Sequence, residues 1–550
     1  MEEIDVNEQL LTHRLRLTED LTDLPYDLVL YLERAVVYSD LGYPDLAAGD
    51  AYRALLLTDE VINEGFEYHE QALEALRDHL GAEAPNVLKH GGLSKEWQYE
   101  PNTNPEGEQE ALEKLATLAS VRAFQILSLS LLLCGCLRSA ATFCERGLRA
   151  TPGNKELLNC KGHIKTFARR KLGRVDYEID DLPEHGLVRR EVYPWNDHEP
   201  DRFDPESLKA LNDDLCEMAP KCEIQVAILP ILLEGASETD EYDIIPTCKQ
   251  LGVFAKEDIA PGEAVLREYS LLTANNRLKD SVCDACSCDL PPLGSEQEPV
   301  NCDECYDTVF CSQDCHDRAQ ERYHPAVCEK DVDAIAKDPS AIESDETLYL
   351  LLLARVLALA SHQEVHPLDV REVKFIWGDF VPTRTNDIDP SPNAGPPPEW
   401  TLPFSFKYNI ETPLHMLEKM DVDIFATLAN HDLWVLNTLY AKFRGTASAR
   451  KSLRDGRPDV AAVHPYWCLA NHDCDPNVTW DWGGRMVLWA REKRVADGRT
   501  GGIKKGEEIL NHYCDINLPV HQRREWARGS LGGWCMCKRC RSEAAAAEKN

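Results

Sequence analysis

Closely spaced pairs of cysteines are the feature that most constrains how this chain folds. Four pairs follow one another in one stretch, as CxxC, CxxC, CxxxC and HxxxC. A two-residue gap lets both thiolates reach one ion, and a three-residue gap on a helix places both side chains on one face. This spacing predicts two tetrahedral zinc sites rather than free core cysteines. The eight predicted ligands are Cys283, Cys286, Cys302, Cys305, Cys311, Cys315, His324 and Cys328, with Cys288 left over.

A second cysteine cluster, CMCKRC, lies near the C-terminal end of the chain. It supplies Cys535, Cys537 and Cys540, which leaves a tetrahedral structural site one ligand short. Cys474, in the stretch NHDCDPN, is the candidate for the fourth ligand. A buried Cys474 without a metal is the alternative. With the eight ligands above, the sequence predicts three bound zinc ions.

Whether the 21 cysteines form disulfides or bind metal depends on the compartment of the protein. The first ten residues, MEEIDVNEQL, have neither the basic patch nor the apolar core of a secretory or mitochondrial leader. Metal sites are therefore favoured over disulfides. The longest apolar run, residues 126–137, is too short to span a bilayer and predicts a buried helix. We expect an intracellular protein, of the cytoplasm or the nucleus, with no membrane partner.

The formal net charge of −36 excludes some classes of partner and favours others. Such a chain repels phosphate backbones, so direct nucleic-acid binding is disfavoured. An acidic surface attracts basic partners such as lysine-rich protein tails, although charge also serves solubility alone.

Helical hairpins are predicted in the N-terminal region. Residues 25–80 keep apolar residues at three-four spacing and break at LGYPD. A second helical pair is predicted within residues 121–158, with Pro152 ending its second helix. The two pairs resemble tetratricopeptide-type repeats, but residues 90–110 interrupt any strict period.

The remaining segments differ in their patterns. Residues 176–245 predict an irregular, acidic connection, with a surface segment at 194–207. Residues 251–268 predict a β-hairpin around the turn APGE. Helices are expected over 344–362 and 412–443, separated by an exposed proline-rich loop, and β-structure is expected after Trp467. That loop is NDIDPSPNAGPPPEW, residues 386–400.

Four ordered motifs resemble one family. The ending FCSQDCHDRAQERYHPAVC is similar to that of a MYND zinc finger, and NHDCDPN resembles the NHSCxPN signature of SET-domain lysine methyltransferases. GEEILNHYCD resembles their GEExxxxY motif, and CMCKRC resembles the post-SET zinc knuckle. With the finger following a first SET segment, the order is similar to that of SMYD-type proteins over about residues 246–541.

The resemblance implies an α+β multidomain fold. It would join TPR-like α-helical hairpins to a β-rich SET fold with a pseudoknot, an exception to unknotted topology. A MYND finger and a helical segment would be inserted, and a post-SET knuckle would follow. The predicted segments are 1–175 (helical, TPR-like), 176–245 (connection), 246–282 (first SET segment), 283–328 (MYND finger), 329–460 (helical insert), 461–518 (SET core) and 519–550 (post-SET region and tail).

The resemblance also implies how the zinc ligands pair. Cross-bracing would place Cys283, Cys286, Cys311 and Cys315 on one ion, and Cys302, Cys305, His324 and Cys328 on the other. Cys474 would complete the C-terminal site and staple the two strands of the pseudoknot.

S-adenosylmethionine is the cofactor that the resemblance implies. Asn471 and His472 would contact it, and Tyr513 would orient the methyl group and the incoming amine; a core tyrosine is the alternative for Tyr513. In KQLG, Lys249 would meet the methionine carboxylate and Gly252 would allow close backbone approach. Gln250 stands where the family has a glycine. Asn437 resembles a further cofactor contact, with a helix-surface asparagine as the alternative.

The implied activity is transfer of a methyl group from S-adenosylmethionine to a lysine of a histone or another basic protein. Leu531 and Gly533 stand where relatives place aromatic residues, and Trp534 is the candidate to replace that wall. The alternative function is a non-catalytic adaptor that binds peptide partners through the finger or the helical region.

Overall fold

The computed structural model describes most of the chain and divides it into two units. Unit 1 comprises Met1–Tyr193 and Phe380–Thr438, and unit 2 comprises Pro194–Asp379 and Leu439–Asn550. The proline-rich loop at 386–400 lies outside the described residues. The described residues are 6–89, 97, 105–230, 247–278, 282–292, 294–305, 308–377, 401–452, 455–482, 484–531 and 533–547.

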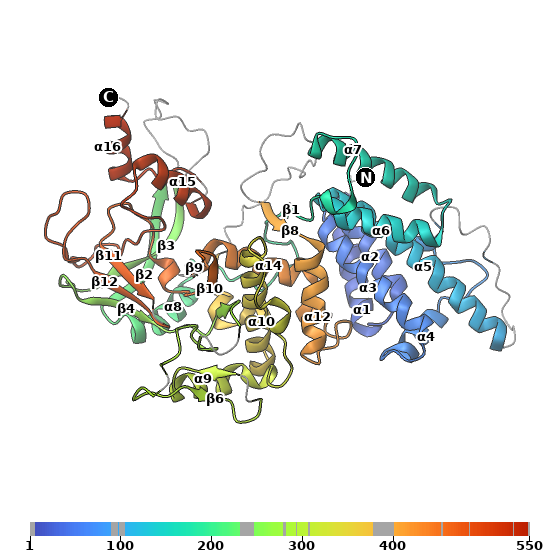
Figure 1. Cartoon of the computed structure of the whole chain (residues 1–550), viewed down its shortest axis with the longest axis horizontal. Helices are drawn as coiled ribbons and strands as arrows, with labels where there is room; N and C mark the ends of the chain where they lie inside the picture. The colour runs from blue at the N-terminus through green and yellow to red at the C-terminus, as the bar shows by residue number, and fades with distance from the viewer. Residues whose placement is uncertain are drawn as a thin grey trace. The chain divides into compact units, whose positions relative to one another are not determined.

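Unit 1 is helical, as the N-terminal pattern predicts. Figure 1 shows its helices side by side, with α3 in contact with both α2 and α5. The helices of its first segment are α1 (Val6–Asp23), α2 (Leu28–Asp40), α3 (Pro44–Ile62), α4 (His69–Arg77), α5 (Pro105–Cys134), α6 (Leu137–Ala150) and α7 (Lys155–Leu172), with the short turns η1 (Asn86–Leu88) and η3 (Ile179–Asp181).

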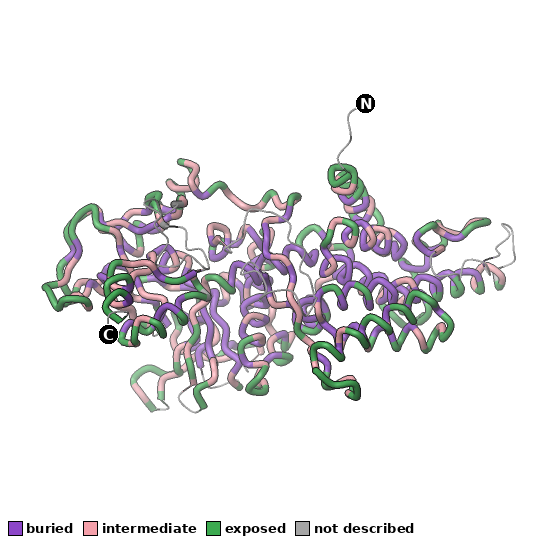
Figure 2. The backbone as a smooth tube through the Cα atoms, turned by 90° about the horizontal axis from the view of Figure 1, so that it is seen from above, coloured by how far each residue is buried: buried purple, intermediate pink, exposed green. Residues whose placement is uncertain are grey.

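Local signals set the ends of these helices. Asp27 caps α2 by accepting hydrogen bonds from the backbone N–H groups of Val29 and Leu30. Gly42, at φ +78°, makes the turn before Pro44 opens α3. Among the described helices, α5 is long and apolar enough to cross a bilayer by length and composition, and 72% of that stretch is buried inside the protein. Figure 2 shows buried residues along the inner faces of the helices.

A later segment of the chain completes unit 1. Strand β1 (Gly186–Arg189) pairs antiparallel with β8 (Thr401–Phe404), which is more than 200 residues away in sequence. The π-helical turn η7 (Lys407–Glu411), α12 (Thr412–Lys419), α13 (Leu428–His431) and the start of α14 (Leu433–Thr446) follow. A Cβ on Gly49 would lie 2.8 Å from Leu433, so α3 needs glycine where α14 packs on it.

In its described residues, unit 2 contains four small antiparallel sheets. They are β2 (Cys222–Pro230) with β3 (Thr247–Ala255), β4 (Ala264–Glu268) with β12 (Met486–Ala490) and β11 (Val478–Trp482), β5 (Thr273–Asn275) with β10 (Pro458–Ala462) and β9 (Ser448–Lys451), and β6 (Val300–Asn301) with β7 (Val309–Phe310). Strands β3, β4, β11 and β12 enclose one apolar core, which includes Leu251, Leu266, Val478 and Leu488.

Helices of unit 2 cover these sheets. They are α8 (Pro205–Met218), α9 (Gln313–Arg322), α10 (Ser344–Gln363), α11 (Arg371–Lys374), α15 (Val520–Leu531) and α16 (Lys538–Ala547), with the turns η4 (His324–Ala326), η5 (Ala334–Ala336), η6 (Pro367–Asp369) and η8 (Trp467–Leu469). The structure therefore confirms a helical N-terminal region joined to a β-rich region. The boundaries of the seven predicted segments stay predictions.

Two predictions about this region are wrong. The turn APGE does separate two strands, but β3 pairs with β2 and β4 pairs with β12, so the strands do not form a hairpin. The chain at 176–245 is not irregular where it is described, because it contains β1, α8 and β2. Both errors have one cause, since partners distant in sequence decide whether a short β-rich run becomes a strand and where it pairs.

Candidate functional site

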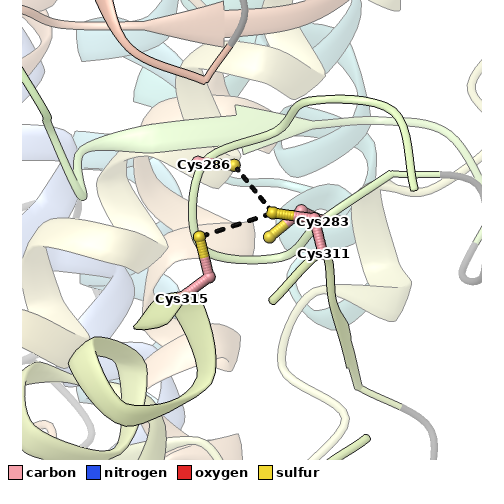
Figure 3. Close-up of side chains that lie close together, drawn as sticks. All are labelled: Cys283, Cys286, Cys311 and Cys315. Carbon is pink, nitrogen blue, oxygen red and sulfur yellow. Dashed lines mark hydrogen bonds between the residues drawn. The ribbon is translucent and has the colours of Figure 1, made fainter. Parts of the chain in front are cut away.

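Four cysteine thiols converge at the first cluster of the finger. The Sγ atoms of Cys283, Cys286, Cys311 and Cys315 lie within 4.8 Å of one another (Figure 3). Cys311 Sγ is 3.7 Å from Cys286 Sγ and 3.5 Å from Cys315 Sγ. Cys315 lies in the first turn of α9, whose cap residue Ser312 accepts a hydrogen bond from the Cys315 backbone N–H.

The second cluster of the finger contains Cys302, Cys305, His324 and Cys328. Cys302 Sγ lies 3.8 Å from Cys328 Sγ, and Cys305 Sγ lies 3.6 Å from His324 Nε2. The ligands of the two clusters alternate in pairs along the chain, so the structure brings together the two cross-braced sets that the resemblance implies.

The third cluster joins Cys474 to Cys535, Cys537 and Cys540. Cys474 Sγ lies 3.4 Å from Cys540 Sγ and 3.9 Å from Cys535 Sγ. The hydrogen bond with Cys474 lowers the pKa of the Cys537 thiol to about 7, so this group ionises readily. Cys474 is buried, but beside the three other thiols rather than alone.

These donor sets fit zinc. Structural zinc takes four thiolate or imidazole ligands with Zn–S bonds near 2.3 Å, which puts sulfur atoms about 3.8 Å apart at the corners of a tetrahedron. The Sγ–Sγ distances given above, 3.4 to 3.9 Å, lie close to this value. The three clusters can therefore hold three zinc ions.

The two SET-like motifs lie side by side. The Asn511 backbone N–H donates to the Asn471 carbonyl at 2.8 Å, and the Asp473 N–H donates to the Asn511 carbonyl at 2.8 Å. His472 and Asn511 form a parallel bridge. Further along, the Leu510 N–H donates to Asn477 Oδ1 at 2.7 Å. The two motifs therefore pair with each other, and the threading of the predicted pseudoknot stays a prediction.

Tyr513 is held at this crossing from both ends. Its backbone N–H donates to His472 Nδ1 at 3.0 Å, and its hydroxyl donates to the Ala470 carbonyl at 3.0 Å. The first bond leaves His472 Nε2 as the protonated nitrogen of a neutral ring. Burial raises the pKa of the Tyr513 hydroxyl, so the group stays protonated at neutral pH and can donate or accept.

Asn471 and Gly252 meet at a third residue that the sequence interpretation missed. Asn471 Nδ2 donates to Glu508 Oε1 at 2.7 Å and to the Leu251 carbonyl at 3.0 Å. A Cβ on Gly252 would lie 2.6 Å from Glu508 Oε1 and 3.1 Å from Asn471 Nδ2. Burial raises the pKa of Glu508. Glu508 could have been identified from the sequence, because it is the second glutamate of the motif GEEILNHYCD.

The remaining predicted site residues lie elsewhere. Lys249 is exposed on β3. Asn437 belongs to unit 1, where it is buried and donates to Asp45 Oδ2 at 2.7 Å. The helix-surface alternative for Asn437 is therefore wrong, and its contact with a cofactor stays a prediction. Trp534 is 43% exposed and packs against the guanidinium of Arg524, 5.5 Å from its ring centroid.

The region that contains both motifs matches a known protein family. The SET domain family matches residues 250–514, a span that contains Gly252, Asn471, His472 and Tyr513. This part of the chain is similar to a SET domain. The finger lies inside the matched span, whereas the third cluster joins Cys474 within that span to three cysteines that follow it after α15.

Curated proteins with similarity to this chain are methyltransferases by name. N-lysine methyltransferase SMYD2 of Homo sapiens is 32% identical over 80 residues, which are 14% of this chain and 17% of that protein. Histone-lysine N-methyltransferase SET5 of Candida glabrata is 31% identical over 84 residues, 15% of each chain. N-lysine methyltransferase SMYD2-A of Danio rerio is 33% identical over 84 residues, 15% of this chain and 18% of that protein. The matched stretch therefore spans less than a fifth of each relative.

Proposed function

We propose that this protein is a protein-lysine N-methyltransferase that uses S-adenosylmethionine and acts on a lysine of a histone or another basic protein. The observation that carries the proposal is the convergence of Gly252, Asn471, His472 and Tyr513 at the crossing of the two SET motifs. The net charge of −36 supports a basic protein substrate.

The substrate amine must lose its proton before it can attack a methyl group. A lysine amine has an ordinary pKa near 10.4 and is cationic at neutral pH. Entry into a desolvated site lowers that pKa and favours the neutral amine. When bound, S-adenosylmethionine would supply an electrophilic methyl group. No nucleophilic side chain is needed, so positioning carries much of the rate.

Tyr513 is the residue that we assign to positioning the reacting amine. Its backbone and its hydroxyl are both tied to the 470–472 segment, so its ring is fixed relative to Asn471 and His472. A phenol oxygen that remains protonated can accept a hydrogen bond from the amine while donating to a carbonyl. Asn471 and Gly252 would form the adjoining wall against the cofactor, and Asn437 remains a proposed contact.

Zinc in this proposal has a structural role. The Cys474 site links the NHDC segment to the knuckle that follows the second motif, so metal there fixes one side of the crossing. The two finger sites would hold β7 and α9 in place, since their ligands flank both elements.

Cofactor binding to the purified chain tests the proposal. We expect calorimetry to show binding of S-adenosylmethionine, and a labelled-cofactor assay on cell extract to show methylated protein. A chain that binds no cofactor would instead support the adaptor function, in which the finger and the helical hairpins bind peptide partners.

A further inference from the structure

The segment at 194–207 lies at the surface as predicted, but one of its side chains, Arg202, is buried in unit 2. Arg202 is only 8% exposed. Its Nη2 donates to Gln250 Oε1 at 3.2 Å, and its guanidinium lies 5.3 Å from the ring centroid of Trp377. The sequence pattern could not reveal the burial of Arg202, because its contacts Gln250 and Trp377 are distant in sequence.

The charge of Arg202 is not neutralised by the described part of the protein. Within those residues no carboxylate lies within ion-pair distance of its guanidinium, and Glu199 is the acid that acts on it. Glu199 already pairs with Lys442 Nζ at 2.8 Å, and the Lys442 side chain is fully buried. Glu199 is thus the acid that acts on both buried cations, and Lys442 has a second one in Asp369, which Arg202 lacks. Burial lowers the pKa of Arg202 to about 10, which reflects the cost of this uncompensated charge.

Strand β3 relates Arg202 to the SET motifs. Alternate residues of a strand share a face, so Gln250 and Gly252 point to the same side and Lys249 points to the other. Gly252 faces Asn471 and Glu508. Gln250, which holds Arg202, is two residues away on that face, a separation of about 7 Å along the strand. The guanidinium therefore lies beside the proposed cofactor site, whereas Lys249 is exposed on the opposite face.

We propose that Arg202, held by Gln250, is an anion subsite that takes the carboxylate of the methionine portion of the methyl donor. This inference rests on the proposed function. The carboxylate would supply the negative charge that Arg202 lacks, and a guanidinium binds carboxylate with two parallel hydrogen bonds. Gln250, which departs from the family glycine, gains a role as the residue that orients the guanidinium.

Two ligands that differ only in that carboxylate test the inference. Calorimetry on the full zinc-loaded chain would compare S-adenosylmethionine with decarboxylated S-adenosylmethionine. We expect the wild-type chain to prefer the carboxylated ligand by about 10- to 100-fold, the range for hydrogen bonds to charged groups. A preference below about two-fold overturns the inference without any mutation.

Substitution of Arg202 assigns the preference to this residue. Arg202→Gln should weaken binding of S-adenosylmethionine to the level of the decarboxylated ligand and leave the decarboxylated ligand unaffected. Arg202→Lys should retain part of the preference, because it retains the charge. Equal weakening of both ligands would show that Arg202 is only structural and overturn the proposal. Arg267→Gln, at an exposed arginine of β4, is the matched control and should change neither affinity.

The two proposals fail in different ways. A wild-type chain that binds neither ligand contradicts the proposed methyltransferase function. A wild-type chain that binds both ligands equally well leaves that function standing and contradicts the role of Arg202.

Discussion

Individual residues at the motif crossing have roles that substitution can separate. Tyr513 touches the Ala470 carbonyl through one oxygen, while its ring and backbone keep their other contacts. Gly252 has no room for a methyl group beside Glu508. The first residue is suited to test chemistry, and the second to test the shape of the cofactor wall.

Tyr513→Phe should reduce turnover by about 100-fold or more, with little change in cofactor affinity. An interaction made mainly in the transition state appears in the rate and not in ground-state binding. The free energy of unfolding should fall by no more than about 1.5 kcal/mol, for one lost hydrogen bond. Melting temperature, cofactor affinity and single-turnover methylation measured on one preparation check this. A stable variant with undiminished turnover contradicts the catalytic assignment.

Gly252→Ala should weaken S-adenosylmethionine binding by about tenfold, because the new methyl group must displace Glu508 from Asn471. Gly162→Ala is the matched control. Gly162 lies in α7 of unit 1 with open space at its Cβ, so alanine there should raise stability by up to about 1 kcal/mol and leave binding unchanged. Calorimetry on both variants makes the comparison, and normal binding by the Gly252 variant would remove this residue from the cofactor wall.

At the scale of elements, local and non-local signals differ in what the sequence reveals. The zinc ligands could be predicted because each pair is set by spacing within a single turn or helix end, and the helices because apolar spacing repeats every three to four residues. The pairing of β3 and β4 could not be predicted, because β3 pairs with β2 and β4 pairs with β12 instead of with each other. The roles of Glu508 and Arg202 could not be predicted for the same reason, since they depend on contacts with the distant residues Asn471 and Gln250.

Disrupting the C-terminal zinc site should leave the two zinc sites of the finger intact. Cys474→Ser should lower the zinc content from three ions to two per chain, because three thiols are left for the C-terminal site. Cys216→Ser, at an exposed cysteine of α8 outside the clusters, should leave three ions. Metal analysis of protein purified without chelator provides the measurement. Three ions in the Cys474 variant would show that another residue is the fourth ligand.

The end of β4 carries a buried carboxylate that makes stability depend on pH. Glu268 accepts hydrogen bonds from the Tyr466 and Trp467 backbone N–H groups, and burial raises its pKa from 4.5 to about 7. Between the two pKa values the folded chain holds the proton on Glu268 more tightly than the unfolded chain does. The resulting stabilisation is therefore complete below about pH 4.5 and is lost as the pH rises through about 7.

We therefore expect the stability of the wild-type chain relative to Glu268→Gln to fall by about 2 kcal/mol between pH 5 and pH 8. Denaturant titrations of both proteins at the two pH values measure this difference. A constant difference would show that Glu268 is not protonated in the folded chain.

At the scale of the whole molecule, metal dependence should distinguish the two units. All three predicted zinc sites lie in unit 2, and the helices of unit 1 pack without them. A strong chelator should therefore remove three ions and unfold much of unit 2, while most of the unit 1 helical signal persists. Metal analysis and circular dichroism before and after chelation check this. A loss of all helical signal would show that the units do not unfold separately.

Unit 1 cannot be completed until a segment far along the chain has been synthesised. Unit 1 begins with the first residues but needs the segment up to Thr438 to supply β8 and the packing of α14 on α3. Thr438, the end of the second part, comes 245 residues after Tyr193, the end of the first (438 − 193). At about 5 to 20 residues per second the ribosome takes roughly 10 to 50 s to complete the second part. During that interval the face of α3 that α14 covers lacks its partner, and we expect chaperones that shield this face to raise the yield of folded chain.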